Sequence, residues 1–302
     1  MTVADISQPR REATWSRLWE KLTPYAYISP FFLGFVAFML IPIAFSLFLS
    51  LARWDGMRAL QFVGLQNFTD LFKDKRFWNA FRVTMIITVT CTIVGPAGSL
   101  FLAVLLDKVG ERIAGWLRAI FFLPSVTSAV VITYIWKQLY STDYGYFNAF
   151  LQQLGLPAQQ WLNGPKLVVP AIMVMLIWAG LGWDALIFSA GLKGIPEELY
   201  DAAKIDGAGD WAEFWHVTFP LLRPCLLFVL VTSVIFLLGI FAQIQLMTDG
   251  GPMHASENLS LYLYTSGFQY HKFGYASAIA VVLTIMMVVG SWLNFRFVRL
   301  EV

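Results

Sequence analysis

Charged residues are scarce in this chain of 302 residues: they make up 13% of it, against about 25% in soluble domains. Hydrophobic residues reach 58%, a share that excludes a disordered, solvated chain and argues against a water-soluble enzyme. The net charge of +2, from 21 Lys and Arg minus 19 Asp and Glu, is too small to indicate binding to nucleic acid. The composition therefore predicts an integral membrane protein.

Residues that carry covalent or metal chemistry are also few. The two cysteines, Cys91 and Cys225, both lie in apolar runs and cannot form a disulfide framework. The three histidines have no spacing that suits a metal. The motifs G-x-x-x-x-G-K-[ST], H-E-x-x-H and G-x-S-x-G are all missing. We therefore predict that the chain is not an enzyme and holds no metal or cofactor of its own.

Long uncharged runs predict six transmembrane helices and an all-α fold. Each run is rich in Leu, Ile, Val and Phe, and each is long enough to cross a hydrocarbon core of about 30 Å. The runs are continuous rather than alternating, which excludes a membrane β-barrel. The predicted spans cover about 25–51, 83–106, 119–136, 167–190, 224–248 and 273–295.

Segments outside these spans have their own character. Residues 144–165 are uncharged but rich in Gln, Asn, Gly and Pro, which predicts a loop with a short helix at the membrane interface. Within residues 1–24, apolar residues at helical spacing are surrounded by Arg and Lys, which predicts an amphipathic helix on the membrane surface. The distribution of Lys and Arg favours the cytoplasm for both termini, including the tail 296–302.

The segment 194–223, between the fourth and fifth predicted spans, carries the most specific pattern. Acidic residues at its start favour the positive end of a short helix, and Asp210 begins a second helix with a capping-box-like pattern. Between them lie residues that allow close approach of a partner or a turn with positive φ: Ala202, Ala203, Gly207 and Gly209. The segment is therefore predicted to be two short helices joined at a glycine turn.

This segment resembles the EAA loop of permease subunits of binding-protein-dependent ABC importers. The family pattern E-A-A-x3-G-x9-I-x-L-P is matched in spacing throughout, at Asp201-Ala202-Ala203, Gly207, Val217, Phe219 and Pro220. TDGGP at 248–252 and FGYASAIA at 273–280 resemble the carbohydrate-uptake branch. The likeness covers nearly the whole chain and is strongest to the first permease of maltose-type and glycerol-phosphate-type pairs.

The resemblance implies a fold, partners and a location. The fold would be the type I ABC importer transmembrane domain, in the plasma (inner) membrane of a bacterium or archaeon. The chain would pair with a second, homologous permease. An ATPase homodimer, which binds the ATP and Mg, would dock on the cytoplasmic side, and an extracellular or periplasmic solute-binding protein would deliver a sugar or related solute. The residues implied in coupling to the ATPase are Glu198, Asp201, Ala202, Ala203, Gly207 and Pro220.

A substrate site is also implied. Sugars are commonly held by aromatic faces and a few hydrogen-bonding groups, and the candidates are Trp178, Gly180, Trp183, Asp184, Ser233, Phe236 and Gln243. Packing between helices is the alternative role for each of them. Where the maltose-type pattern has asparagines, this chain has Leu237 and Ile240, so a maltose-type contact set is not expected.

Asp184 leaves a second class of function open. It is the single charged residue within the predicted spans, and it suits a structural residue near the inner surface, a sugar-binding carboxylate or a proton site. The last role would make the chain an ion-coupled secondary symporter. A membrane enzyme or assembly factor is the third alternative, although no set of catalytic residues supports it.

Overall fold

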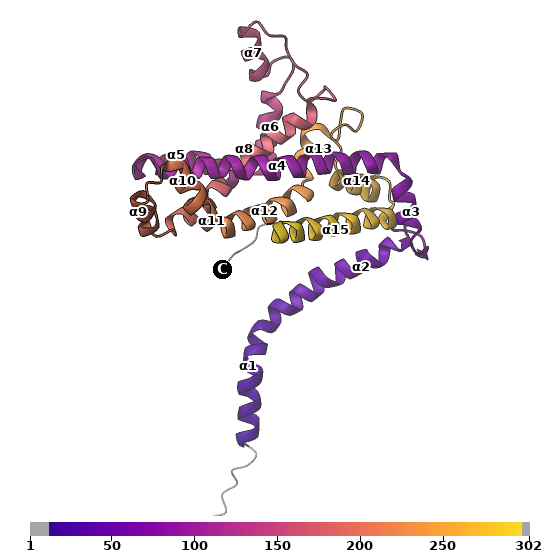
Figure 1. Ribbon diagram of the computed structural model, residues 1–302. Coiled ribbons are helices and arrows are strands. Elements are labelled where there is room, and N and C mark those ends of the chain that lie inside the picture. The colour runs from indigo at the N-terminus through magenta and orange to yellow at the C-terminus, as the bar shows by residue number, and fades with distance from the viewer. Residues whose placement is uncertain (1–11, 298–302) are drawn as a thin grey trace, which may run out of the picture.

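A computed structural model describes residues 12–297, and the first helices form an arm. Helix α1 (Glu12–Phe35), the π-helix η1 (Val36–Leu40) and α2 (Ile41–Ser50) follow one another without an intervening loop. Helix α2 packs along α15 (Phe273–Phe297), whereas α1 extends away from the other helices (Figure 1). In the most apolar stretch of residues 21–50, only 6% of the residues are buried, so this arm presents a large apolar surface.

The arm differs from the sequence expectation at its start. A separate surface helix was expected within residues 1–24, but the described part of that range continues into the membrane-length helix without a break. Pro24 and Pro30 both lie inside α1, and membrane helices tolerate proline more readily than most helices do. The remaining part of the expected surface helix, residues 1–11, lies outside the described residues.

A small hairpin and a short helix connect the arm to the helical body. Strands β1 (Ala52–Arg53) and β2 (Gln61–Phe62) pair antiparallel and lead to α3 (Gln66–Lys73). Asn67 is buried, and its Nδ2 donates to the carbonyl oxygens of Ser50 and Ala52, both at 2.8 Å. This amide satisfies backbone groups at the end of α2 and so fixes where the arm leaves the body.

Helices α4 (Lys75–Asp107) and α8 (Val168–Lys193) form the most extensive helix pair of the described chain. Helix α4 begins before the expected residue 83, because the Asp74 side chain caps it by accepting from the backbone N–H of Arg76 at 2.8 Å. Small residues allow close packing on α4: Ser99 and Ala103 are fully buried. Packing through small residues replaces the hydrophobic driving force that helices lack in lipid.

Two of the expected spans are broken helices. Helices α5 (Glu111–Val126) and α6 (Ala129–Leu139) meet at 100°, so the single helix expected over 119–136 is wrong. The break follows Pro124, where Thr127 and Ser128 are extended, with ψ of 144° and 130°. The expected span 224–248 is likewise divided between α12 (Arg223–Leu238) and α13 (Ala242–Thr248).

The remaining helices lie in the connections. Helix α7 (Tyr146–Gln153) stands away from the helical body (Figure 1) and agrees with the short helix expected within the loop 144–165. The segment 194–223 contains α9 (Glu197–Ile205), α10 (Asp210–Glu213), η2 (Phe214–Thr218) and α11 (Phe219–Leu221). The last connection contains α14 (Leu259–Tyr264) and η3 (Thr265–Gln269).

Among the described residues, four helices are long and apolar enough to cross a membrane, and up to six if each bent pair is one span. Apart from the two-residue strands, the regular structure described is helical, which confirms the predicted all-α fold class. Three buried hydrophobic clusters hold the body together, and α4 contributes to each of them through Ile87, Phe77 and Ala103.

We predict that Gly182→Ala destabilises the protein by about 1–3 kcal/mol, the typical effect of overpacking. A Cβ atom at Gly182, on α8, would overlap the backbone carbonyl of Phe121 on α5. Gly115→Ala on α5 is the matched control, since open space surrounds a Cβ there. The measurement is the thermal unfolding midpoint of each variant in detergent. Equal midpoints for the two variants would contradict the close α5–α8 contact.

Candidate functional site

Helix α9 ends in a tight glycine turn. Gly207 has φ of +81°, its N–H donates to the carbonyl of Lys204 at 3.0 Å, and the N–H of Ala208 donates to Ala203 at 2.9 Å. These two bonds form a Schellman motif, which satisfies carbonyls at the helix end and requires a left-handed residue. The positive φ expected at Gly207 is therefore present, whereas Gly209 has φ of −86° and does not need to be glycine for this reason.

The surface of α9 is open to solvent. None of its side chains is buried: Glu198, Asp201 and Ala202 are exposed, and Ala203 is half-buried. The helix is attached to the body through Tyr200, whose Oη lies 3.1 Å from Thr218 Oγ1 on η2. The Tyr200 side chain also packs against the buried cluster that contains Ala103. Helix α9 is thus a tethered element with a free outer face.

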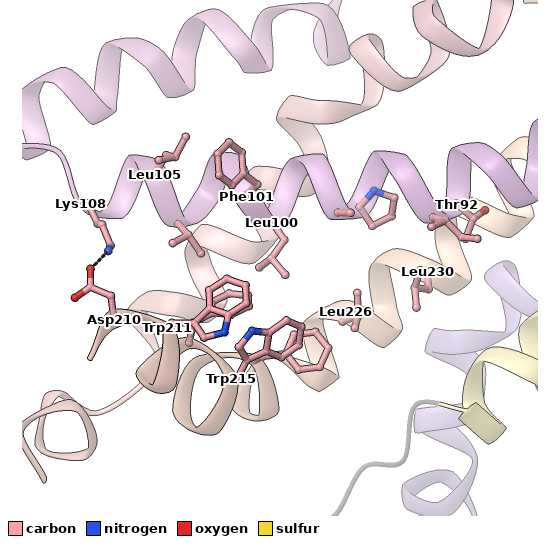
Figure 2. A pocket seen from close by; sticks show the side chains of 16 residues that line it. Thr92, Leu100, Phe101, Leu105, Lys108, Asp210, Trp211, Trp215, Leu226 and Leu230 are labelled. Atoms are coloured by element: carbon pink, nitrogen blue, oxygen red, sulfur yellow. Dashed lines mark hydrogen bonds and ion pairs between the residues drawn. The ribbon is translucent and has the colours of Figure 1, made fainter. Parts of the chain in front are cut away.

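The second short helix is fixed by a contact that the sequence pattern did not indicate. Asp210 was expected to cap its own helix, but Gly209 is the N-cap and no side-chain cap bond is made. Instead Asp210 Oδ2 accepts from Lys108 Nζ at 2.5 Å (Figure 2). The hydrogen bond from Lys108 holds the pKa of Asp210 below its ordinary value, and the same contact raises the pKa of Lys108.

An apolar groove of about 730 Å³ lies beside this ion pair. One wall is the C-terminal half of α4, including Leu100 and Phe101 (Figure 2). The other wall is formed by α10, η2 and α12, with Trp211 and Trp215 pointing into the space. Pro220, the last residue of the matched motif, is half-buried on α11 at the end of this segment.

The two candidate tryptophans of the substrate site pack toward α5 and α6. Trp178 lies 5.4 Å from Trp136 between ring centroids, and Trp183 stacks on Phe122 at 6.1 Å with an interplanar angle of 19°. Both indoles remain partly open, with 39% of Trp178 and 51% of Trp183 exposed. One face of each ring is therefore occupied by packing within the chain.

The other candidates are spread over three helices. Gly180 and Asp184 are half-buried on α8, Ser233 is half-buried and Phe236 exposed on α12, and Gln243 is half-buried on α13. None of the seven candidates lines the apolar groove. The described chain does not gather them into that cavity.

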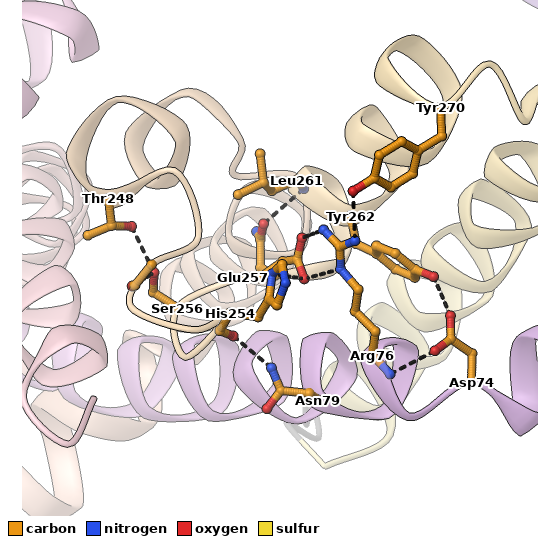
Figure 3. A network of polar contacts seen from close by, with 12 residues as sticks. Asp74, Arg76, Asn79, Thr248, His254, Ser256, Glu257, Leu261, Tyr262 and Tyr270 are labelled. Atoms are coloured by element: carbon orange, nitrogen blue, oxygen red, sulfur yellow. Dashed lines mark hydrogen bonds and ion pairs between the residues drawn. The ribbon is translucent and has the colours of Figure 1, made fainter. Parts of the chain in front are cut away.

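The structure adds a polar network at the start of α4 (Figure 3). Arg76 donates to Glu257 through Nε at 2.8 Å and Nη2 at 2.7 Å, and its guanidinium lies 5.0 Å from the centroid of Tyr262. Only 2% of the Glu257 side chain is exposed. His254 Nδ1 lies 3.1 Å from the same carboxylate. A buried carboxylate needs such partners, because desolvation without them is costly.

Asp74 extends this network to the last span. Its Oδ2 accepts hydrogen bonds from Tyr262 Oη and from Tyr275 Oη, the latter at 2.9 Å. Burial alone would raise the pKa of Asp74, but these bonds and the one from Arg76 N together lower it below its ordinary value. No sequence spacing indicated this set, because Arg76 and Glu257 are 181 residues apart.

Comparison with known proteins identifies the family. A family model described as "Binding-protein-dependent transport system inner membrane component" matches residues 95–300. This chain belongs to that family.

Similar curated proteins include the lactose transport system permease protein LacF of Rhizobium radiobacter, which is 34% identical over 91% of this chain and 93% of its own length. The probable ABC transporter permease protein YurN of Bacillus subtilis is 33% identical over 92% of this chain and 97% of its own length. The sn-glycerol-3-phosphate transport system permease protein UgpA of Agrobacterium fabrum is 30% identical over 93% of this chain and 96% of its own length.

A solved structure has the same fold. The bacterial alginate ABC transporter, in complex with its alginate pentasaccharide-bound periplasmic protein, contains a chain with a TM-score of 0.82 at 23% identity. The match covers 95% of this chain and 100% of that chain. The fold is thus that of an ABC importer permease, and this protein is a multi-pass membrane component of such a transporter. The ion-coupled symporter alternative is not supported.

We predict that Asp74→Asn lowers the free energy of unfolding by about 1–2 kcal/mol at neutral pH, because bonds to an ionised acceptor are lost. Since the native pKa of Asp74 is lowered, its contribution to stability is full above its ordinary pKa of 3.8 and is lost as the pH falls below it. The wild type should therefore lose stability in acid more steeply than the variant.

The measurement is the unfolding midpoint in detergent across an acid pH series. Asp70→Asn is the control, because Asp70 is an exposed acid on the neighbouring helix α3. Parallel pH profiles for wild type and Asp74→Asn would contradict the assignment.

Proposed function

We propose that this protein is the permease subunit of an ATP-driven importer that carries a sugar or related solute. A second homologous permease would complete the membrane pore, an ATPase homodimer would supply the energy, and an extracellular or periplasmic binding protein would deliver the solute. Support for the solute class comes from relatives named for lactose, diacetylchitobiose and arabinooligosaccharides. In this proposal the chain is non-catalytic, and ATP and Mg are bound by the ATPase alone.

The observation that carries the proposal is the exposed helix α9 with its closed glycine turn. A chain without a nucleotide motif receives energy from ATP only through contact with another subunit. Helix α9 offers a compact contact surface, with two acids in its first turn and a tether through Tyr200. We propose that Glu198, Asp201, Ala202 and Ala203 contact the ATPase, with Gly207 and Pro220 shaping the segment. In this proposal, α9 and both termini lie in the cytoplasm, on the same side as the ATPase.

The solute path is proposed to run along α8, α12 and α13. Trp178, Trp183 and Phe236 each keep an exposed aromatic surface in this chain, on which a sugar ring packs well. Gly180, Ser233 and Gln243 lie on the same helices, and the break between α12 and α13 frees backbone polar groups of the kind found at transport sites. We assign Asp184 to this path as a solute-binding carboxylate.

Asp184 is not proposed as a proton carrier. Within residues 12–297 its side chain makes no hydrogen bond or ion pair with another residue, whereas proton relays use several partners. We predict that Asp184→Asn leaves uptake dependent on ATP and unaffected by an uncoupler at constant ATP. The measurement is labelled-solute uptake into proteoliposomes that contain the whole transporter. Uptake that follows the pH gradient in the wild type at constant ATP would contradict the ATP-driven mechanism.

We predict that Gly207→Pro abolishes solute uptake while the protein still inserts in the membrane. Proline fixes φ near −65° and removes the N–H that donates to Lys204, so the turn and the position of α9 are lost. Gly209→Ser is the matched control, because its φ is negative and serine suits the N-cap position that Gly209 occupies.

The measurements are ATPase co-purification and uptake for each variant. Association and uptake at wild-type level in Gly207→Pro would overturn the coupling role of this segment. Equal loss in Gly209→Ser would show that the glycine turn is not the specific cause.

A further inference from the structure

The segment 210–221 begins with α10, the second short helix of the proposed coupling region, and is called the coupling segment below. It is not packed closely on α4. The apolar groove lies between the C-terminal half of α4 and the segment 210–221. This segment meets α12 at a bend of 65°. Close packing would force the segment and α4 to move together, whereas a groove beside a bend leaves room for the angle between them to change.

The Lys108–Asp210 ion pair bridges the groove at one end (Figure 2). Lys108 is the C-cap residue of α4, and Asp210 is the first residue of α10. The two side chains therefore join the end of a membrane-spanning helix to the start of the second coupling helix. They are separated by 102 residues in sequence, so the pair is a tertiary contact and not part of one local turn.

The exposure of the Lys108–Asp210 pair indicates that it sets the position of α10 relative to α4 and adds little to the folding stability of the protein. Lys108 is 59% and Asp210 84% exposed, and exposed ion pairs contribute little to folding. Asp210 is the first residue of its helix, and the N-cap position, where an aspartate would ordinarily bond to the helix start, is held by Gly209. Its carboxylate instead contacts the lysine across the groove.

We propose that Lys108 and Asp210 are a positioning pair that transmits displacement of the coupling segment to α4. The covalent chain already connects this segment to α12 through the 65° bend. The ion pair adds a second connection to α4, and α4 packs along α8. Movement of the coupling segment then displaces α12, α4 and α8 together. This inference rests on the proposed function, because it requires the ATPase to move the segment.

The test is charge exchange in the complete transporter, reconstituted with its ATPase, second permease and binding protein. Lys108→Asp and Asp210→Lys each place like charges across the groove, and each is expected to lower the solute transported per ATP hydrolysed by about two- to fivefold. The double variant Lys108→Asp/Asp210→Lys restores opposite charges and is expected to recover most of the wild-type ratio. If each residue acted only within its own helix, the double variant would not recover the transport ratio.

Two further variants serve as controls. Arg112→Asp makes the same change of charge as Lys108→Asp at an exposed residue near the start of the following helix α5, and it is expected to leave the transport ratio unchanged. Asp210→Asn removes the charge with almost no change of shape, and it is expected to reduce the ratio less than Asp210→Lys. Equal recovery of assembled complex establishes that each variant has folded.

The possible failures are distinguishable. A wild-type transporter that takes up solute without ATP would overturn the proposed function and the pair's role with it. ATP-dependent uptake in the wild type, with unchanged ratios in Lys108→Asp and Asp210→Asn, would overturn the positioning pair alone. Loss in both single variants without recovery in the double variant would also overturn it.

Discussion

The packing of α4 is the constraint on which the rest of the structure depends. This helix contributes to all three buried clusters and forms the most extensive helix pair with α8. The close approach requires small residues such as Ser99 and Ala103, because helices in lipid gain no hydrophobic energy from mutual contact and rely on dense packing. Helices α5, α8 and α12 all pack directly against it.

The two ends of α4 are held by contacts of different character. At its start, the Arg76–Glu257 pair is largely buried and bidentate, so breaking it would leave an uncompensated charge. At its end, the Lys108–Asp210 pair is exposed, and water readily replaces either partner. The buried pair therefore contributes to holding the last connection on α4, whereas the exposed pair adds little to folding stability.

The broken helices have a related consequence. Backbone groups freed at Thr127–Ser128 and at Gly239–Phe241 require polar partners in a membrane. Helix α13, which follows the second break, is held against α6 by Lys137, whose Nζ donates to the carbonyl of Leu246 at 3.0 Å. This contact joins the C-terminal ends of α6 and α13, away from the two breaks. In the proposed function, the backbone groups at the breaks offer polar surface to the solute path.

The sequence by itself determined the features that depend on local spacing. Uncharged windows predicted the apolar helical spans, although not the breaks in two of them, and the pattern around Gly207 predicted the positive φ of the Schellman turn. Both predictions depend on neighbouring residues. Tertiary structure decided the rest. The partners of Arg76 and Asp210 lie 181 and 102 residues away, and helix α6, which follows the break after Pro124, packs on the distant helix α13. The tryptophans of α8 pack on α5 and α6. The arrangement of the helices determines these contacts, and the spacing of residues along one helix does not predict them.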